Sequence, residues 1–170
     1  TLDLAALPSV MAPHFGSAQM MAVVAMLVVG FGVKAAIVPM HTWLPDAHSA
    51  APSGISAMLS GIVIEAGLIV MLRALLAVAG LQWGMLLVIL AVVTMFVGNL
   101  IALRQSDLKR MFAYSSVAQM GYIVMGVGLA LGYPQVAAFS GMRGALYHTL
   151  NHAIMKGGAF LCAGVFLYVL

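Results

Sequence analysis

Charged side chains are scarce in this sequence, and their scarcity excludes most classes of soluble protein. Lysine, arginine, aspartate and glutamate together make up 6% of the 170 residues, whereas apolar residues make up 64%. A typical soluble domain has about a quarter of its residues charged. The net charge of +3 rests on a few separated residues, which form no basic patch for nucleic acid. We therefore predict an integral membrane protein with no nucleic-acid partner.

Cysteine and nucleotide-binding motifs are nearly absent as well. The single cysteine, Cys162, lies in an apolar run and belongs to no CxxC pair. One thiol cannot hold an iron–sulfur cluster or form a disulfide framework. The chain also lacks a GxGxxG motif of the kind that binds a dinucleotide after a strand. These absences predict a chain with no cofactor and no metal of its own.

Long apolar runs account for most of what the sequence does contain. About 20 helical residues cross a hydrocarbon core, and a backbone in lipid must satisfy its own hydrogen bonds. The runs therefore predict an all-α integral membrane protein, a multi-spanning transmembrane bundle of about five helices. We interpret residues 1–170 as a single transmembrane region that is a fragment of a larger subunit. The predicted spans cover residues 17–38, 53–79, 84–103, 107–132 and 138–170.

Two segments interrupt these runs. Residues 39–53, PMHTWLPDAHSAAPS, hold three prolines and two histidines, which predicts a discontinuous, proline-broken helix beginning at Pro39. Residues 104–110, RQSDLKR, form a short charged turn with three basic residues, and Ser106 or Asp107 can cap the helix after it. The positive-inside rule places this turn on the cytoplasmic (or matrix or stromal) side. Counting the spans places the PDAH turn, residues 45–48, on the same side.

The most informative charged groups lie in YHTLNHAIMK, residues 147–156. His148, His152 and Lys156 follow one another at intervals of four, so they form a stripe about 12 Å long on one helical face. The stripe could be a polar seam that holds helices together, or a haem or metal site, although no third ligand is near in sequence. We favour a proton relay, because histidine titrates near neutrality and a buried lysine gives up its proton more easily than a solvated one.

Two further ionisable residues lie within the predicted spans. Glu65, the only glutamate, sits well inside the second span, and Lys34 lies near the end of the first, one turn before Pro39. A charge at mid-bilayer costs about 2.5–3.5 kcal/mol on insertion scales, so such residues usually face a partner or a water-filled path. We predict a functional or paired role for Glu65. Lys34 either snorkels to the interface or serves an ion site at the helix break.

Three stretches of the chain resemble a known family. Residues 30–73 around VKAAIVPMHTWLPDAH, residues 106–122 (SDLKRMFAYSSVAQMGY) and residues 151–161 (NHAIMKGGAFL) are similar to the proton-translocating, antiporter-like membrane subunits. That family is shared by respiratory complex I, Mrp sodium/proton antiporters and membrane-bound hydrogenases, including formate hydrogenlyase. The resemblance runs in order over nearly the whole chain after about residue 20.

The resemblance implies a role for each residue already singled out. Lys34 corresponds to the family's pumping lysine on the discontinuous helix, and His148, His152 and Lys156 correspond to its later relay. Glu65 stands where many members have a lysine, so it could pair with Lys34 or Lys156 or carry the proton itself. This glutamate and the sequence SAAPSGISAMLSG, residues 49–61, favour the hydrogenase-type branch. The carboxylate that pairs with the pumping lysine in this family, and a later broken helix, lie outside these residues.

The predicted function is that of a proton-translocating subunit of a redox-driven ion pump, itself without the redox centre. Its partners are then other membrane subunits, further antiporter-like ones among them, in a bacterial or archaeal plasma membrane or an organelle inner membrane. The transported ion is H⁺, or Na⁺ in the rival case of an Mrp-type antiporter without a redox partner. The other rival is a structural membrane scaffold.

Overall fold

The computed structural model describes residues 6–14, 16–78 and 83–169, and in these ranges every regular element is a helix. A short helix α1 (Leu7–Met11) and a 3₁₀ turn (Ala12–His14) precede α2 (Ala18–Lys34). Then follow α3 (Trp43–Ala50), α4 (Ser53–Met58), a π-helical turn η2 (Leu59–Val63) and α5 (Ile64–Val78). The chain ends with α6 (Gly84–Ala102), α7 (Leu108–Gly132) and α8 (Pro134–Val169).

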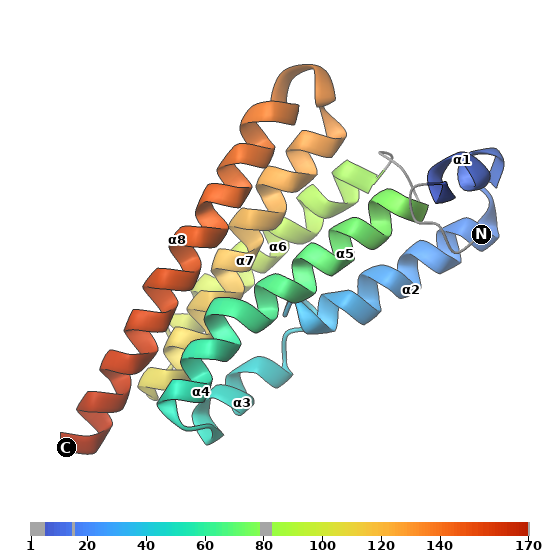
Figure 1. Ribbon diagram of the computed structural model, residues 1–170. Helices are drawn as coiled ribbons and strands as arrows, with labels where there is room; N and C mark the ends of the chain where they lie inside the picture. Colours follow the sequence, from blue (N-terminus) through green and yellow to red (C-terminus); the bar gives the residue numbers. More distant parts are fainter. Residues whose placement is uncertain (1–5, 15, 79–82, 170) are drawn as a thin grey trace.

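The long helices form one bundle whose apolar lengths suit a membrane. Four helices, bounded as Ser53–Ala77, Gly84–Ala102, Leu108–Gly132 and Gln135–Val169, are long and apolar enough to span it, and Ala18–Lys34 is a shorter apolar helix. In Figure 1 the five run side by side, with α3, the start of α4 and the α6–α7 turn gathered at one end. This arrangement confirms the predicted all-α membrane bundle of about five helices.

The break after α2 comes earlier than the sequence predicts. We expected the first helix to continue to residue 38, but α2 ends at Lys34, and Ala36 has a left-handed φ of 53°. Pro39 cannot donate a backbone hydrogen bond and disfavours helical geometry in the residue before it, so its effect reaches upstream. The predicted discontinuity between α2 and α3 is present. Residue 79, the predicted end of the second span, lies outside the described residues.

The last helix begins earlier than predicted. We expected its start at residue 138, whereas α8 starts at Pro134. Proline suits a first helical position because its φ is preset and its missing N–H would have no partner there. At the other end of the preceding turn the prediction is confirmed: Asp107 caps α7, its Oδ1 accepting the backbone N–H of Arg110 at 2.7 Å.

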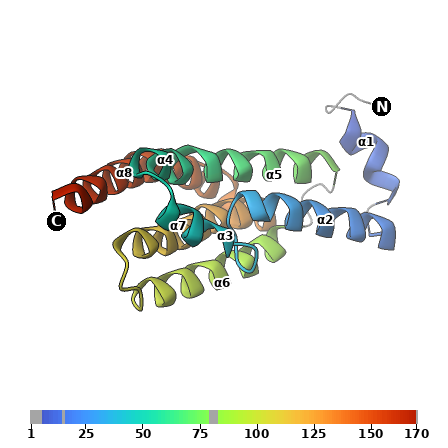
Figure 2. The ribbon, with the colours of Figure 1, turned by 90° about the horizontal axis from the view of Figure 1, so that it is seen from below.

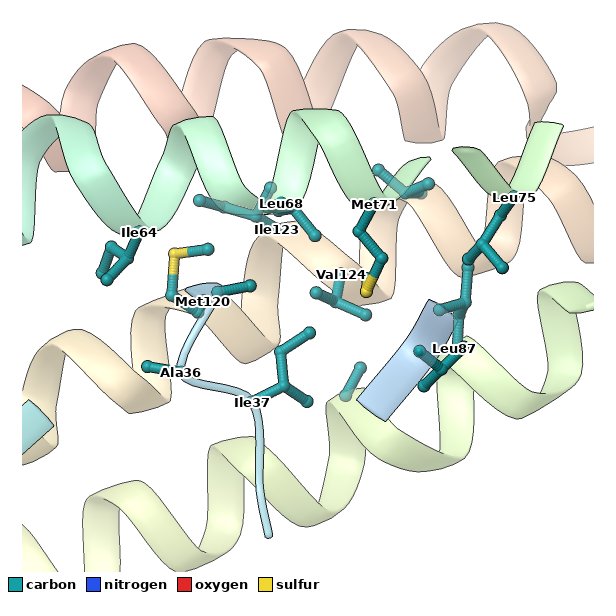
Figure 3. Close-up of a cluster of buried hydrophobic side chains, with 14 of the residues drawn as sticks. Ala36, Ile37, Ile64, Leu68, Met71, Leu75, Leu87, Met120, Ile123 and Val124 are labelled. Carbon is teal, nitrogen blue, oxygen red and sulfur yellow. The ribbon is translucent and has the colours of Figure 1, made fainter. Parts of the chain in front are cut away.

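The core fills the space between α5, α7 and the segment that links α2 to α3. Figure 3 shows Ile64, Leu68, Met71 and Leu75 of α5 facing this link and α7, with Leu87 of α6 at one side. These five side chains are at most 2% exposed. Seen from below, α5 and α6 lie on opposite sides of the bundle with α7 between them (Figure 2). The linker is thus packed in the core, and it fixes where Lys34 and α3 lie.

Candidate functional site

The three residues of the predicted stripe face neighbouring helices. His148, His152 and Lys156 each bond to a side chain of α5 or α7, and the polar face of α7 supplies two of these partners. His152 is fully buried and Lys156 is 5% exposed. The stripe therefore lies in the interior of the bundle, along the faces that α8 presents to α5 and α7.

Lys156 is held by two groups of α7. Its ammonium donates to the hydroxyl of Ser115 and to the carbonyl oxygen of Phe112, the latter at 3.3 Å. The nitrogen also lies 5.9 Å from the centre of the Phe112 ring, within reach of a cation–π attraction. All three contacts are with uncharged groups, and no carboxylate within 4.0 Å neutralises the ammonium among the described residues.

Glu65 pairs with a histidine of the stripe. Its Oε1 lies 2.8 Å from Nδ1 of His152, and the glutamate is only 7% exposed. The resemblance left open that Glu65 pairs with Lys34 or Lys156 or carries the proton itself, and in the described residues neither lysine forms an ion pair with it. The sequence could not reveal this pairing, because it depends on how α5 and α8 are rotated against each other. The only glutamate and a stripe histidine form one buried acid–base pair.

A π-helical turn directly precedes Glu65. Residues Leu59–Val63 form this turn, and Ser60 within it bonds to Ser116 of α7, with hydroxyl oxygens 2.7 Å apart. A π turn inserts one extra residue into a helix, which rotates everything after it relative to what came before. The rotation sets the face on which Glu65 emerges. No residue pattern signals this turn, and we predicted an uninterrupted helix here.

His148 continues the polar connection toward the other end of α8. Its Nε2 lies 2.6 Å from the side-chain oxygen of Gln119, and its ring meets Tyr122 edge-on at 6.0 Å. Tyr122 in turn accepts a hydrogen bond from Asn99 of α6 at 3.3 Å. Polar and aromatic contacts thus link α8 to α7 and α7 to α6, and they end at the exposed side chains of Tyr122 and Asn99.

Lys34 lies apart from the stripe. Its side chain is exposed at the end of α2 and forms no hydrogen bond or ion pair with the residues the structure describes. Its backbone packs closely on Gly67 of α5, where an added Cβ would come within 2.9 Å of the Lys34 carbonyl carbon. The indole of Trp43 donates to the carbonyl of Val33 at 2.6 Å, which satisfies one acceptor at the helix end. The backbone at the helix break is thus tightly packed, whereas the ammonium of Lys34 is exposed.

The loop end of the bundle is fixed by basic residues. Arg110 bonds to Asp46 of α3 at 2.8 Å, and Lys109 donates to the carbonyl of Ala51 at 2.9 Å. These bonds bring the PDAH turn and the basic turn to the same end of the bundle, as the count of spans predicted. Both ends of α3 are thereby tied to the start of α7.

His48 was missed as a candidate. It is fully buried, and neither ring nitrogen has a hydrogen-bond partner among the described residues. A histidine next to a broken helix was the available signal.

The stripe was also considered as a metal site. The described part of the chain has no group of three potential ligands from histidine, cysteine, aspartate or glutamate.

Comparisons with known proteins agree in pointing to one family. The family model described as NADH:quinone oxidoreductase/Mrp antiporter, TM, matches residues 1–169. Hydrogenase-4 component B of Escherichia coli is 41% identical over 81% of this chain and 22% of its own length. F(420)H(2) dehydrogenase subunit N of Methanosarcina mazei is 41% identical over 86% of this chain and 29% of its own. NADH-quinone oxidoreductase subunit M of Rickettsia prowazekii is 36% identical over 80% and 27%.

Solved structures give the same result. The Mrp complex from a Dietzia species matches with a TM-score of 0.72 at 27% identity, over 85% of this chain and 26% of the other. The membrane-bound sulfane sulfur reductase, an archaeal respiratory membrane complex, matches with a TM-score of 0.70 at 38% identity, over 84% and 28%. This chain therefore spans about a quarter of the length of the proteins it resembles. The predicted membrane location is confirmed by the membrane-spanning family and the apolar helices.

Proposed function

Because this chain belongs to the NADH:quinone oxidoreductase/Mrp antiporter transmembrane family, we propose that it translocates protons as part of a subunit in a redox-driven ion pump. The proton moves through a relay of buried ionisable side chains. The relay residues are Lys34, Glu65, His148, His152 and Lys156.

One observation carries this proposal: an acid–base pair and a lysine lie one helical turn apart in the interior of a membrane bundle. Glu65 and His152 are 2.8 Å apart, and Lys156 follows His152 by one turn of α8. Placing ionisable groups in lipid is costly, so a row of them marks an ion path more often than a structural seam. The polar partners Ser115 and Gln119 extend the row without adding charge.

The proposed mechanism is electrostatic. An ion pair between Lys34 and a carboxylate of another segment opens or closes when the partner complex turns over, which changes how readily Lys34 releases its proton. The exposed ammonium of Lys34 is available for such a partner. The released proton then passes through bound water to Glu65 and along the stripe.

The proposal assigns the redox chemistry to other subunits. The matched relatives are named as parts of hydrogenase, F(420)H(2) dehydrogenase and NADH-quinone oxidoreductase, and the neighbouring structures are multi-subunit membrane complexes. We propose that this chain likewise binds other membrane subunits, further antiporter-like ones among them, in a bacterial or archaeal plasma membrane. It holds no cofactor of its own in this scheme.

The test is ion translocation in sealed vesicles that contain the full complex, with redox turnover followed separately. Lys156→Met and Lys34→Ala are expected to lower proton pumping at least tenfold, because a positioned acid–base group commonly contributes a factor of 10² or more. Lys109→Met is the matched control, since Lys109 is also basic, and the one hydrogen bond of its ammonium within the described residues goes to a carbonyl at the loop end. Unchanged pumping in both relay variants would show that the polar row only holds helices together.

A sodium/proton antiporter without a redox partner is the second candidate, favoured by the structural match to the Mrp complex. A sodium site needs several oxygen ligands around one ion. The same vesicles distinguish the two functions. Transport that requires sodium and continues without redox turnover supports the antiporter, whereas sodium-independent transport that stops with turnover supports the redox-driven pump.

A further inference from the structure

His48 of α3 occupies an unusual position for a polar side chain. His48 is fully buried, and both of its ring nitrogens lack a hydrogen-bond partner among the described residues. The cost of leaving a buried polar group unsatisfied is about 1–3 kcal/mol, so such a group calls for a specific explanation. A residue needed only for packing could be a phenylalanine here, without that cost.

The surroundings of His48 connect it to the stripe. Its ring stacks on Phe160 of α8, with centroids 4.4 Å apart and planes 11° from parallel. Phe160 meets Phe112 edge-on at 5.8 Å, and Phe112 holds the ammonium of Lys156 through its carbonyl and its ring. His48 and Lys156 thus lie on the same aromatic cluster.

The helix that carries His48 is tied to the loop end of the bundle. Lys109 is half-buried at the start of α7, and its ammonium donates to the carbonyl of Ala51, just beyond α3, at 2.9 Å. Asp46, also on α3, points out to Arg110 and is 72% exposed. The short helix α4 contributes no titratable side chain. His48 therefore belongs to a helix that is tied to the loop end, and its ring stacks on the aromatic cluster that holds Lys156.

We propose that His48 is a proton-carrying residue that joins the loop end of the bundle to Lys156. The role rests on the proposed translocation function and adds a residue to its path. The transfer balances on a neutral ring: a proton binds the unprotonated nitrogen, and the N–H proton leaves from the other nitrogen toward water near Lys156. Exchange of the tautomer, or rotation of the ring, then restores the starting state.

The experiment compares four variants of the full complex in sealed vesicles. His48→Phe keeps an aromatic ring against Phe160 but cannot carry a proton, and His48→Gln keeps polarity without ready proton transfer. Phe160→Leu is the matched control that removes the stacking and leaves the imidazole. We expect pumping to fall about tenfold in both His48 variants, below the full contribution of an acid–base group because water can partly replace the ring. Their solvent isotope effect in D₂O rises, and Phe160→Leu pumps at near the wild-type rate.

Two results would overturn the role of His48. The first is normal pumping in His48→Phe or His48→Gln. The second is an equal loss in His48→Phe and Phe160→Leu with an unchanged isotope effect, which identifies a packing role. The fourth variant, Lys156→Met, separates this proposal from the proposed function. If Lys156→Met abolishes pumping while both His48 variants pump normally, only the role of His48 fails. If Lys156→Met pumps normally, as does the Lys34→Ala variant described above, the translocation function itself fails.

Discussion

The stripe on α8 and the helix break at Lys34 hold the same kinds of residue but are built in opposite ways. In the stripe, every ionisable side chain has a partner on another helix, as in the 2.8 Å contact of His152 with Glu65. At the break, the backbone is tightly packed against Gly67 while the ammonium of Lys34 is exposed. A proton path needs side chains held at fixed positions along its length and a group that can change its partner where the driving signal arrives. The buried, hydrogen-bonded stripe suits the first task, and the exposed ammonium of Lys34 suits the second.

The largest expected effect tests whether the stripe acts as a unit. Glu65→Gln and His152→Gln should each lower pumping at least tenfold, and the double variant should pump no worse than either single one. In the proposed relay both residues serve one proton-transfer step, so removing either removes the step, and their effects cannot add. Pumping by the complex in sealed vesicles measures all three. Losses that multiply in the double variant would indicate that Glu65 and His152 have two independent roles. The stripe would then not act as a unit, in contrast to the single exposed lysine at the helix break.

An intermediate effect is expected at the helix break, on stability rather than on transport alone. Gly67→Ala places a Cβ within 2.9 Å of the Lys34 carbonyl carbon, so α2 and α5 must separate. Overpacking of this kind costs about 1–3 kcal/mol. Gly30→Ala is the control, because an added Cβ at Gly30 of α2 meets nothing within 4 Å.

Thermal unfolding of the purified complex measures this difference. Gly67→Ala should lower the midpoint, and Gly30→Ala should leave it unchanged or raise it slightly, since alanine favours a helix over glycine. Equal midpoints for the two variants would show that the backbone contact at Lys34 is loose. The backbone at the helix break would then not hold the exposed side chain of Lys34 rigidly in place.

The smallest effect is expected at the loop end. The ion pair of Asp46 with Arg110 is 2.8 Å long, but the two side chains are 72% and 38% exposed. Exposed pairs of this kind contribute about 0–1 kcal/mol. Asp46→Asn should therefore change the unfolding midpoint little and leave pumping unchanged. A large loss of pumping would mean that the relay extends to the surface at this point, beyond both regions compared above.

Much of the fold could be predicted because the bilayer leaves few choices. The apolar runs predicted α4–α5, α6 and α7 within a few residues, and Asp107 was correctly expected to cap α7. The errors have local causes. Pro39 ends α2 at Lys34, upstream of the expected point, and Pro134 begins α8 early because proline fits the first turn. The π turn before Glu65 has no pattern that sequence periodicity could detect.

The site was only half predictable for a related reason. Spacing by four residues places His148, His152 and Lys156 on one face of any α-helix, and it does the same for Ser115 and Gln119. Spacing within one helix says nothing about which neighbour that face will meet. The pairing of Glu65 with His152, and the burial of His48 against Phe160, both join residues from different helices.

The sequence by itself determined that this chain lies in a membrane, that it is helical, and which residues share a helical face. These properties follow from hydrocarbon transfer and from the period of the α-helix, both of which act locally along the chain. Only the tertiary structure decided that Glu65 meets His152, that Lys34 stays open, and that His48 lies beside the stripe. Those outcomes depend on how helices rotate and slide against one another, which is fixed by packing between residues far apart in the sequence.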